Sequence, residues 1–270
     1  MARKEVIRGM KAIATEEVKN IDGRAIHFIQ IGKLVQVNST VSYGNMSYKY
    51  GPHEQVKANR ELFWSDLLKV SEIKKSRGIL EPIIMNPSMT KDIMVIGKQI
   101  RGEGWESIST FLKCDGLLLL KPPHTHIIPI GLPVADCAPV SIYIPTAHSI
   151  LVIHVSWKNI DIIQEALQIA YGIHLAAASH KPFHLILIVG PAGRYLFYDK
   201  EQEKEILIDI HHMIEQQIVQ FESQHSEDGF RLEVYFSQYL TTDSDVFFSN
   251  HILNLLNQPP ARFMSLSFLI

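Results

Sequence analysis

The chain has 270 residues, of which 46% are hydrophobic and 20% are charged, and its net charge is −2. No long run of one charge occurs, which excludes nucleic acid or an acidic membrane surface as the main partner. The apolar segment from Ile127 to Val155 is interrupted by four prolines and Asp136, so it predicts buried strands and no membrane span. The absence of a secretory pattern, and the presence of two cysteines, predict a cytoplasmic protein with thiols and no disulfide.

The first half of the chain is expected to hold short strands and one helix. Hydrophobic runs bounded by Gly, Pro, Asn or Asp predict the strands. The helix is expected from about His53 to Ile73, where apolar residues recur at helical spacing. The predicted strands are Ala25–Gln30, Lys33–Val37, Ile79–Met85, Asp92–Ile96 and Gly116–Leu120.

The second half alternates between strands and helices. One helix is expected over Asn159–Ala177, with Asn159 as its N-cap. A longer helix is expected within Lys200–Ser223, with Ile206 and Leu207 on its apolar face. This mixture predicts one α/β or α+β domain with mixed sheets. The predicted strands are Pro139–Ile144, Ile150–Val155, Phe183–Val189, Arg231–Phe236 and Phe263–Leu269.

Cys137, in VADCAPV, and His154, in HVSWKN, form the most informative pair in the sequence. Cys137 lies just before one predicted strand and His154 ends the next, so a thiol and an imidazole are expected at one edge of a sheet. Such a pair suits a metal site or a nucleophile with its base. The alternative is packing alone, because cysteine is among the most buried residue types.

These two segments resemble the "ADC-x-P … HAGWRG" signature of the YfiH-like laccase-domain family. The resemblance covers residues 25–270 and leaves 1–24 as an N-terminal extension. It implies a single α+β domain with four layers, α/β/β/α, and mixed sheets. Further matching segments are YGNMSYKYGPHEQVKANR through Asn45, Val56, Asn59 and Arg60, KCDGLLL through Asp115, VGPAGRYLFYDKE through Gly190, Pro191 and Ala192, and DVFFSN…ARFMSLSFLI through Phe247, Phe248, Ser249 and Arg262.

The resemblance also implies an activity and a metal. Members of the family are described as multicopper polyphenol oxidoreductases, zinc-dependent purine nucleoside enzymes and peptidoglycan editing factors. The resemblance implies phosphorolysis of purine nucleosides and deamination of adenosine by a zinc-bound water, with a nucleoside and phosphate as partners. Cys137 and His154 match two of the three zinc ligands, and Asp115 matches a polar catalytic residue of the pocket. The implied substrate-binding residues are Asn45, Arg60, Lys158 and Arg262.

The first zinc ligand of the family, a histidine, is missing here. The segment NPSMTKDIMVI places Met89 at that position, or Ser88 if the register shifts by one. His124 and His126, in PPHTHIIPIG, lie just upstream of the ADC segment, and either is a candidate replacement for the missing imidazole.

Two other hypotheses do not need a third imidazole. The thioether of Met89, with Cys137 and His154, suits copper(I) better than zinc. Alternatively, the metal is absent and Cys137 acts as a nucleophile with His154 as its base, as in a cysteine hydrolase. A peptidoglycan editing amidase and a non-catalytic member of the family are the remaining alternatives.

Overall fold

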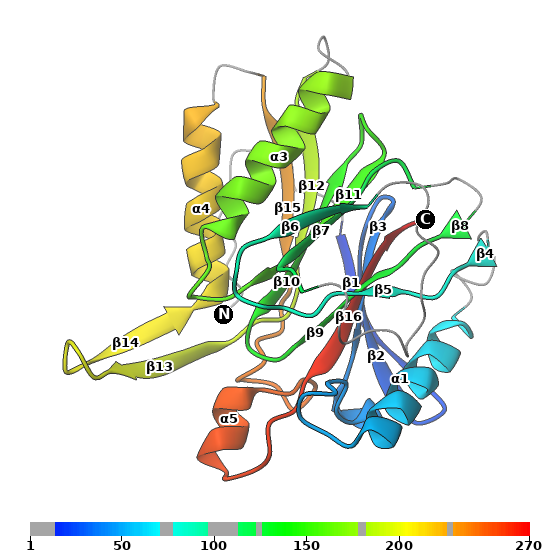
Figure 1. Cartoon of the computed structure of the whole chain (residues 1–270), viewed down its shortest axis with the longest axis vertical. Helices are drawn as coiled ribbons and strands as arrows, with labels where there is room; N and C mark the ends of the chain where they lie inside the picture. The colour runs from blue at the N-terminus through cyan, green and yellow to red at the C-terminus, as the bar shows by residue number, and fades with distance from the viewer. Residues whose placement is uncertain (1–13, 71–77, 97–112, 123–125, 178–181, 226–228) are drawn as a thin grey trace.

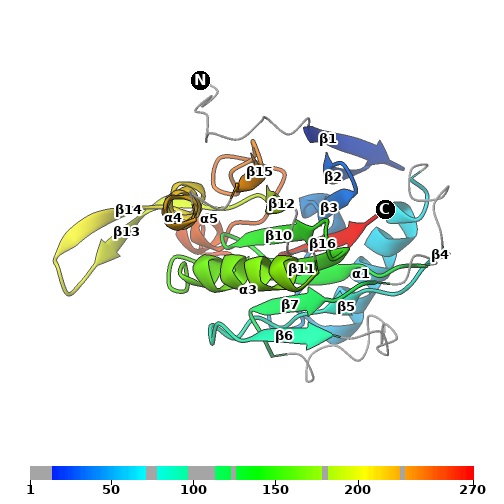
Figure 2. The same cartoon turned by 90° about the horizontal axis from the view of Figure 1, so that it is seen from above.

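The computed structural model describes residues 14–70, 78–96, 113–122, 126–177, 182–225 and 229–270. Two six-stranded sheets lie face to face, and helices cover the outer face of each (Figures 1 and 2). This confirms the predicted α+β class and the expected order of layers. None of the helices in the described ranges is both long and apolar enough to cross a membrane.

The first sheet contains strands from both ends of the described chain. Its pairs are antiparallel apart from the parallel pair at one edge, β5 with β9. In spatial order its strands are β1 (Ala14–Ile21), β2 (Arg24–Ile31), β3 (Leu34–Ser39), β16 (Phe263–Leu269), β9 (Ile130–Val134) and β5 (Ile83–Ile84).

The second sheet carries Cys137 and His154 near the ends of its two central strands. Parallel pairs lie at its two edges, and the central pairs are antiparallel, so this sheet is mixed as well. In spatial order its strands are β15 (Arg231–Phe236), β12 (His184–Val189), β10 (Ala138–Ile144), β11 (Ser149–Val155), β7 (Gly116–Leu119) and β6 (Ile93–Ile96).

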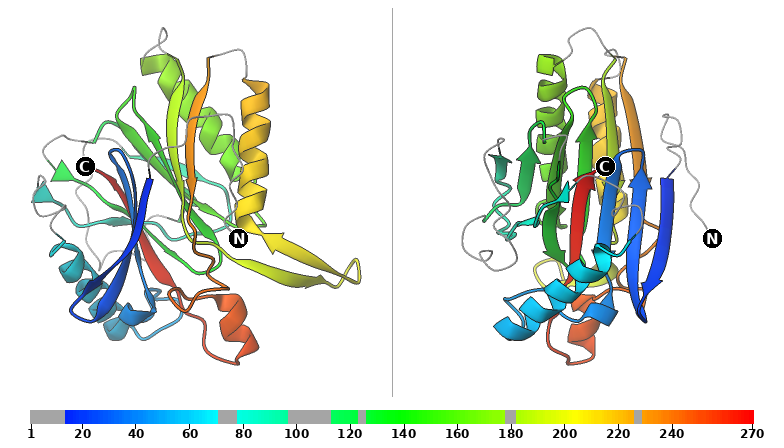
Figure 3. Two further views of the ribbon diagram at one scale, coloured as in Figure 1. Left: turned by 180° about the vertical axis from the view of Figure 1, so that it is seen from behind. Right: turned by 90° about the vertical axis from the view of Figure 1, so that its right-hand side faces the viewer.

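Three apolar layers hold the sheets and helices together. Helix α1 (His53–Leu67) packs on the first sheet, and helices α3 (Ile162–Ala177) and α4 (Ile210–Gln224) pack on the second. The third layer lies between the sheets, which the edge-on view of Figure 3 separates clearly. Because both faces of the second sheet are covered, β10 and β11 are buried at every position. Runs such as ILVIHV are therefore continuously apolar and do not alternate.

The helix predicted within Lys200–Ser223 is wrong in its first part. Lys204–Asp209 form β14, which pairs with β13 (Arg194–Asp199) as a hairpin that projects from the body (Figure 1). The helix α4 begins after Asp209, whose carboxylate accepts a hydrogen bond from the backbone N–H of His212. Ile206 and Leu207 thus belong to the hairpin, because the N-cap at Asp209 fixes where helical geometry begins.

Two other local predictions are corrected. The strand expected over Ile79–Met85 is split into β4 (Gly78–Ile79) and β5, and β4 pairs with β8 (His126–Ile127). Proline at position 82 lacks the N–H that a continuous strand needs. Asn159 does not cap α3, which begins at Ile162. The side chain of Asn159 accepts hydrogen bonds from the backbone N–H and the hydroxyl of Ser156.

Strand β1 lies inside the segment expected as an extension, residues 1–24. It pairs with β2 along its whole length, from Ala14 opposite Ile31 to Ile21 opposite Arg24. The buried carboxylate of Glu16 accepts hydrogen bonds from His27 Nε2 at 2.8 Å, Ser237 Oγ at 2.6 Å, Tyr235 Oη at 2.7 Å and the Gln238 N–H at 2.9 Å. Glu16 therefore ties the edge of the first sheet to the chain that leaves the second sheet.

Candidate active site

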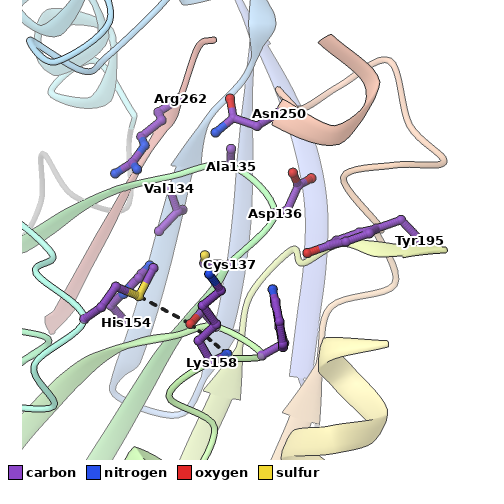
Figure 4. A pocket seen from close by; sticks show the side chains of 12 residues that line it. Val134, Ala135, Asp136, Cys137, His154, Lys158, Tyr195, Asn250 and Arg262 are labelled. Atoms are coloured by element: carbon purple, nitrogen blue, oxygen red, sulfur yellow. Dashed lines mark hydrogen bonds between the residues drawn. The ribbon is translucent and has the colours of Figure 1, made fainter. Parts of the chain in front are cut away.

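A cavity of about 260 Å³ opens where the β9–β10 loop meets the end of β11 (Figure 4). Pro139 lies opposite His154 in the antiparallel pair of β10 and β11. Cys137 and His154 therefore lie at the same end of these two strands, as their spacing predicts. The cavity is lined by Met89, Val134, Ala135, Asp136, Cys137, His154, Ser156, Trp157, Lys158, Tyr195, Asn250 and Arg262.

Asp115 lies behind His154 and fixes the orientation of its ring. Both side chains are buried, and the distance from His154 Nδ1 to Asp115 Oδ1 is 3.1 Å. The carboxylate also accepts backbone hydrogen bonds from Ser88 at 3.2 Å, Thr90 at 2.6 Å and Lys91 at 3.0 Å. Burial raises the pKa of Asp115, but the bonds from His154 and from the loop outweigh it and lower this pKa to about 2. With Nδ1 held by a carboxylate, Nε2 is the nitrogen left for chemistry.

His154 in turn forms a hydrogen bond with the side chain of Cys137. Burial alone lowers the pKa of His154. The attraction of the Cys137 sulfur and the hydrogen bonds with Asp115 and Cys137 act in the opposite direction and raise this pKa to about 9. This raised pKa favours the protonated form of the imidazole. Carboxylate, imidazole and thiol form one connected series, the arrangement in which a base is oriented by a third group.

Met89 occupies the wall of the cavity where a third ligand is expected. Its backbone has φ of 61°, and its sulfur accepts a hydrogen bond from Ser156 Oγ at 3.4 Å. A zinc site needs three N, S or O ligands from the protein. Within the described ranges, no three His, Cys, Asp or Glu side chains are placed to hold a metal ion. The described residues therefore do not fit zinc.

Of the two histidines proposed as replacements, His126 does not line this cavity. His126 is an exposed residue of β8, which pairs with β4 away from the cavity lining. His124 lies outside the described residues. The three donors of the copper hypothesis, Met89, Cys137 and His154, all line the cavity. The thioether of Met89, however, already accepts a hydrogen bond from Ser156.

Comparisons with known proteins agree with this architecture. No family model and no curated protein matches the sequence. The solved structure of the hypothetical protein YfiH of Bacillus licheniformis is similar, with a TM-score of 0.63 and 18% identity, over 90% of this chain and 96% of that one. The structure of YlmD of Geobacillus stearothermophilus has a TM-score of 0.64 and 16% identity, over 94% and 98%. NMB0706 of Neisseria meningitidis, described as DUF152, has a TM-score of 0.56 and 15% identity, over 88% and 94%.

The chain has the YfiH-like fold. Of the residues that the resemblance implied for binding, Lys158 and Arg262 line the cavity of this fold, whereas Asn45 and Arg60 do not. The amide oxygen of Asn45 accepts a hydrogen bond from the backbone N–H of Arg262 at 3.0 Å. The buried guanidinium of Arg60 donates to the carbonyl oxygen of Met46 at 2.9 and 2.6 Å. In this YfiH-like fold, the Asn45 and Arg60 side chains stabilise the contact of the segment at Asn45 and Met46 with Arg262.

Asp136, Tyr195 and Asn250 are among the lining residues that sequence reasoning missed as site candidates. A signal existed for Asp136, because it directly precedes Cys137 in the motif. Tyr195 is the second residue of β13, and Asn250 is the first residue of the short helix α5 (Asn250–Leu255). Neither element was predicted, so no local pattern pointed to these two residues.

Proposed function

We propose that the chain is a thiol-dependent enzyme in which Cys137 attacks the acyl carbon of a small anionic substrate. The observation that carries this proposal is the buried contact of Asp115 with His154 Nδ1, which turns the rest of the imidazole toward Cys137. The absence of three suitable ligands within the described ranges favours this chemistry over the zinc-dependent reaction.

The reaction divides into acylation and hydrolysis. The Cys137 sulfur attacks the carbonyl carbon, and His154 gives a proton to the departing amine or alcohol, which leaves a thioester. A water molecule, deprotonated by His154, then attacks the thioester, so that the acid is released and the thiol is restored. Asp115 keeps the imidazole oriented through both steps. An amide of a peptidoglycan precursor is one substrate of this class.

The anionic character of the substrate is inferred from the cavity lining. Lys158 and Arg262 both line the cavity, and the Lys158 ammonium lies 5.3 Å from the ring centroid of Trp157. Two cations at one cavity favour a carboxylate or phosphate group on the substrate. The cavity volume of about 260 Å³ suits a small acyl group at the Cys137 sulfur.

Chromogenic esters and anilides test this proposal, each with and without a carboxylate on its acyl group. We expect turnover, a mass increase at Cys137 that matches the acyl group, and preference for the anionic member of each pair. His154→Gln should lower the rate about 100-fold or more. Cys114→Ser is the matched control, because Cys114 is buried outside the cavity lining. Turnover that survives Cys137→Ser would overturn the proposal.

A second candidate is phosphorolysis of purine nucleosides, the activity implied by the resemblance. Lys158 and Arg262 favour it, because a phosphate and a nucleoside both suit a small cavity with two cations. Incubation with inosine or adenosine and phosphate should release the free base if this candidate is right. If neither reaction occurs, both candidate activities are rejected and the non-catalytic alternative is favoured.

For the location of the protein, we propose the cytoplasm. Cys114 and Cys137 form no disulfide. Thiols persist in reducing compartments, which supports that proposal.

A further inference from the structure

Asp136 lies directly before Cys137 in the loop from β9 to β10, and it joins three segments that are remote in sequence. Its Oδ1 accepts a hydrogen bond from Thr241 Oγ1 at 2.9 Å, and its Oδ2 accepts one from the backbone N–H of His251 at 2.9 Å. Its carbonyl oxygen accepts a third from the backbone N–H of Gly193 at 2.7 Å. These contacts exist only when the whole chain is folded.

The segments bound by Asp136 carry two walls of the cavity. Tyr195 follows Gly193 by two residues, and Asn250 immediately precedes His251; both line the cavity. The rings of Tyr195 and His251 are stacked, with their centroids 4.7 Å apart. Figure 4 shows Asp136 between Asn250 and Tyr195.

The approach of Gly193 to Asp136 leaves no room for a side chain. A Cβ atom at position 193 would lie 2.8 Å from Asp136 Cβ and 3.3 Å from Asp136 Cα. The base of the β13–β14 hairpin is therefore packed closely against the loop that carries Cys137, and the carboxylate of Asp136 adds the start of α5 to the same junction.

We propose that Asp136 is a positioning residue whose carboxylate holds the walls bearing Tyr195 and Asn250 around Cys137. By holding them, it limits the size of the molecule that reaches the sulfur. The proposal rests on the proposed function only in taking Cys137 as the reactive group. The proposed role of Asp136 depends on its two side-chain hydrogen bonds and not on its charge. An amide at position 136 keeps both bonds, because its NH₂ group donates to Thr241 Oγ1 and its oxygen accepts from the His251 N–H.

The test compares alkylation of Cys137 by iodoacetamide, which is small, with alkylation by a bulky dye-linked maleimide. The rates are measured by peptide mass spectrometry, and the ratio of the small-reagent rate to the bulky-reagent rate measures size selection. Loss of two hydrogen bonds to a carboxylate in Asp136→Ala should lower this ratio about tenfold. Asp136→Asn, the matched control, should stay within about twofold of the wild type, because both hydrogen bonds remain.

Cys114 reports on unfolding in the same experiment, because its side chain is buried. An unchanged ratio in Asp136→Ala, with Cys114 unlabelled, would overturn the proposal. A loss in Asp136→Asn equal to that in Asp136→Ala would overturn it as well, since charge would then be the cause. If Asp136→Ala exposes Cys114, Thr241→Val removes one bond only; a smaller drop supports the proposal and no drop contradicts it.

Failure of the proposed function would look different. Labelling needs an accessible thiol and no turnover, so size selection is measurable even if no ester or amide is hydrolysed. Conversely, hydrolysis that requires Cys137, together with an unchanged ratio in Asp136→Ala, would retain the proposed function and reject the role of Asp136.

Discussion

Asp115→Asn is the substitution that most directly perturbs the buried series of Asp115, His154 and Cys137. The pKa of Asp115 falls from its usual 3.8 to about 2 in the folded chain. At 1.36 kcal/mol per pKa unit, this shift corresponds to about 2 kcal/mol of stability at neutral pH. The amide also has one acceptor oxygen where the carboxylate has two. Either the N–H groups of Thr90 and Lys91 or those of Ser88 and His154 therefore lose their acceptor, at about 1 kcal/mol or more.

We therefore expect Asp115→Asn to lower the free energy of unfolding by about 3 kcal/mol, and Tm by about 6–12 °C. Urea denaturation and calorimetry measure the two quantities. Asp161→Asn is the matched control, because it removes the exposed ion pair between Asp161 and Lys91. This change should lower the free energy of unfolding by less than about 1 kcal/mol.

The pH dependence follows from the direction of the shift. A carboxyl group whose pKa is lowered on folding contributes its stability in full above pH 3.8, and the contribution is lost as the pH falls through about 2. The stability difference between wild type and Asp115→Asn should thus be constant from pH 6 to pH 5, where the contribution of His154 is also full, and shrink toward pH 2. A difference below 1 kcal/mol at pH 7, or one equal to that of Asp161→Asn, would refute this reasoning.

Three further predictions concern His154, Met89 and Glu16. The pKa of His154 is raised on folding, so its contribution to stability is full below pH 6.5 and is lost as the pH rises through about 9. Denaturation measured at several pH values should show this loss of stability in the wild type and not in His154→Gln. Met89→His should bind about one zinc ion per chain by elemental analysis, because it completes a three-ligand set, whereas Met89→Leu should bind none. Glu16→Ala should lower the free energy of unfolding by about 3 kcal/mol, since four donors lose their acceptor, whereas the exposed neighbouring change Glu17→Ala should cost less than about 0.5 kcal/mol.

The sequence predicted those parts of the fold that depend on local pattern. Strands β10 and β11 and the short turn between them are set by apolar runs and turn residues, and they alone bring Cys137 near His154. Helix α1 begins at His53 as expected. Strand β14 was mistaken for helix because Ile206, Leu207 and Ile210 fit a helical face equally well. The Asp199 side chain, which accepts from the backbone N–H groups of two residues that follow, was the missed turn signal.

The rest of the site depends on contacts between remote residues. Asp136 and Thr241 are 105 positions apart, and Asp136 and His251 are 115 apart. No periodicity or spacing encodes such pairs, so the roles of Asp136, Tyr195 and Asn250 emerge only from the folded chain. Met89 was expected at the site only from the resemblance, which matches NPSMTKDIMVI to the family's histidine-bearing segment, and it lines the cavity.

The central claim is that Cys137 works with His154 and Asp115 and without a metal ion. The rate of Cys137 alkylation by iodoacetamide, measured before and after treatment with a chelator, tests it most directly. A thiolate bound to a metal is protected from alkylation, and a chelator releases it. We predict that the chelator leaves the rate unchanged. A marked acceleration of Cys137 alkylation after chelation would contradict the claim and point to a metal at this site.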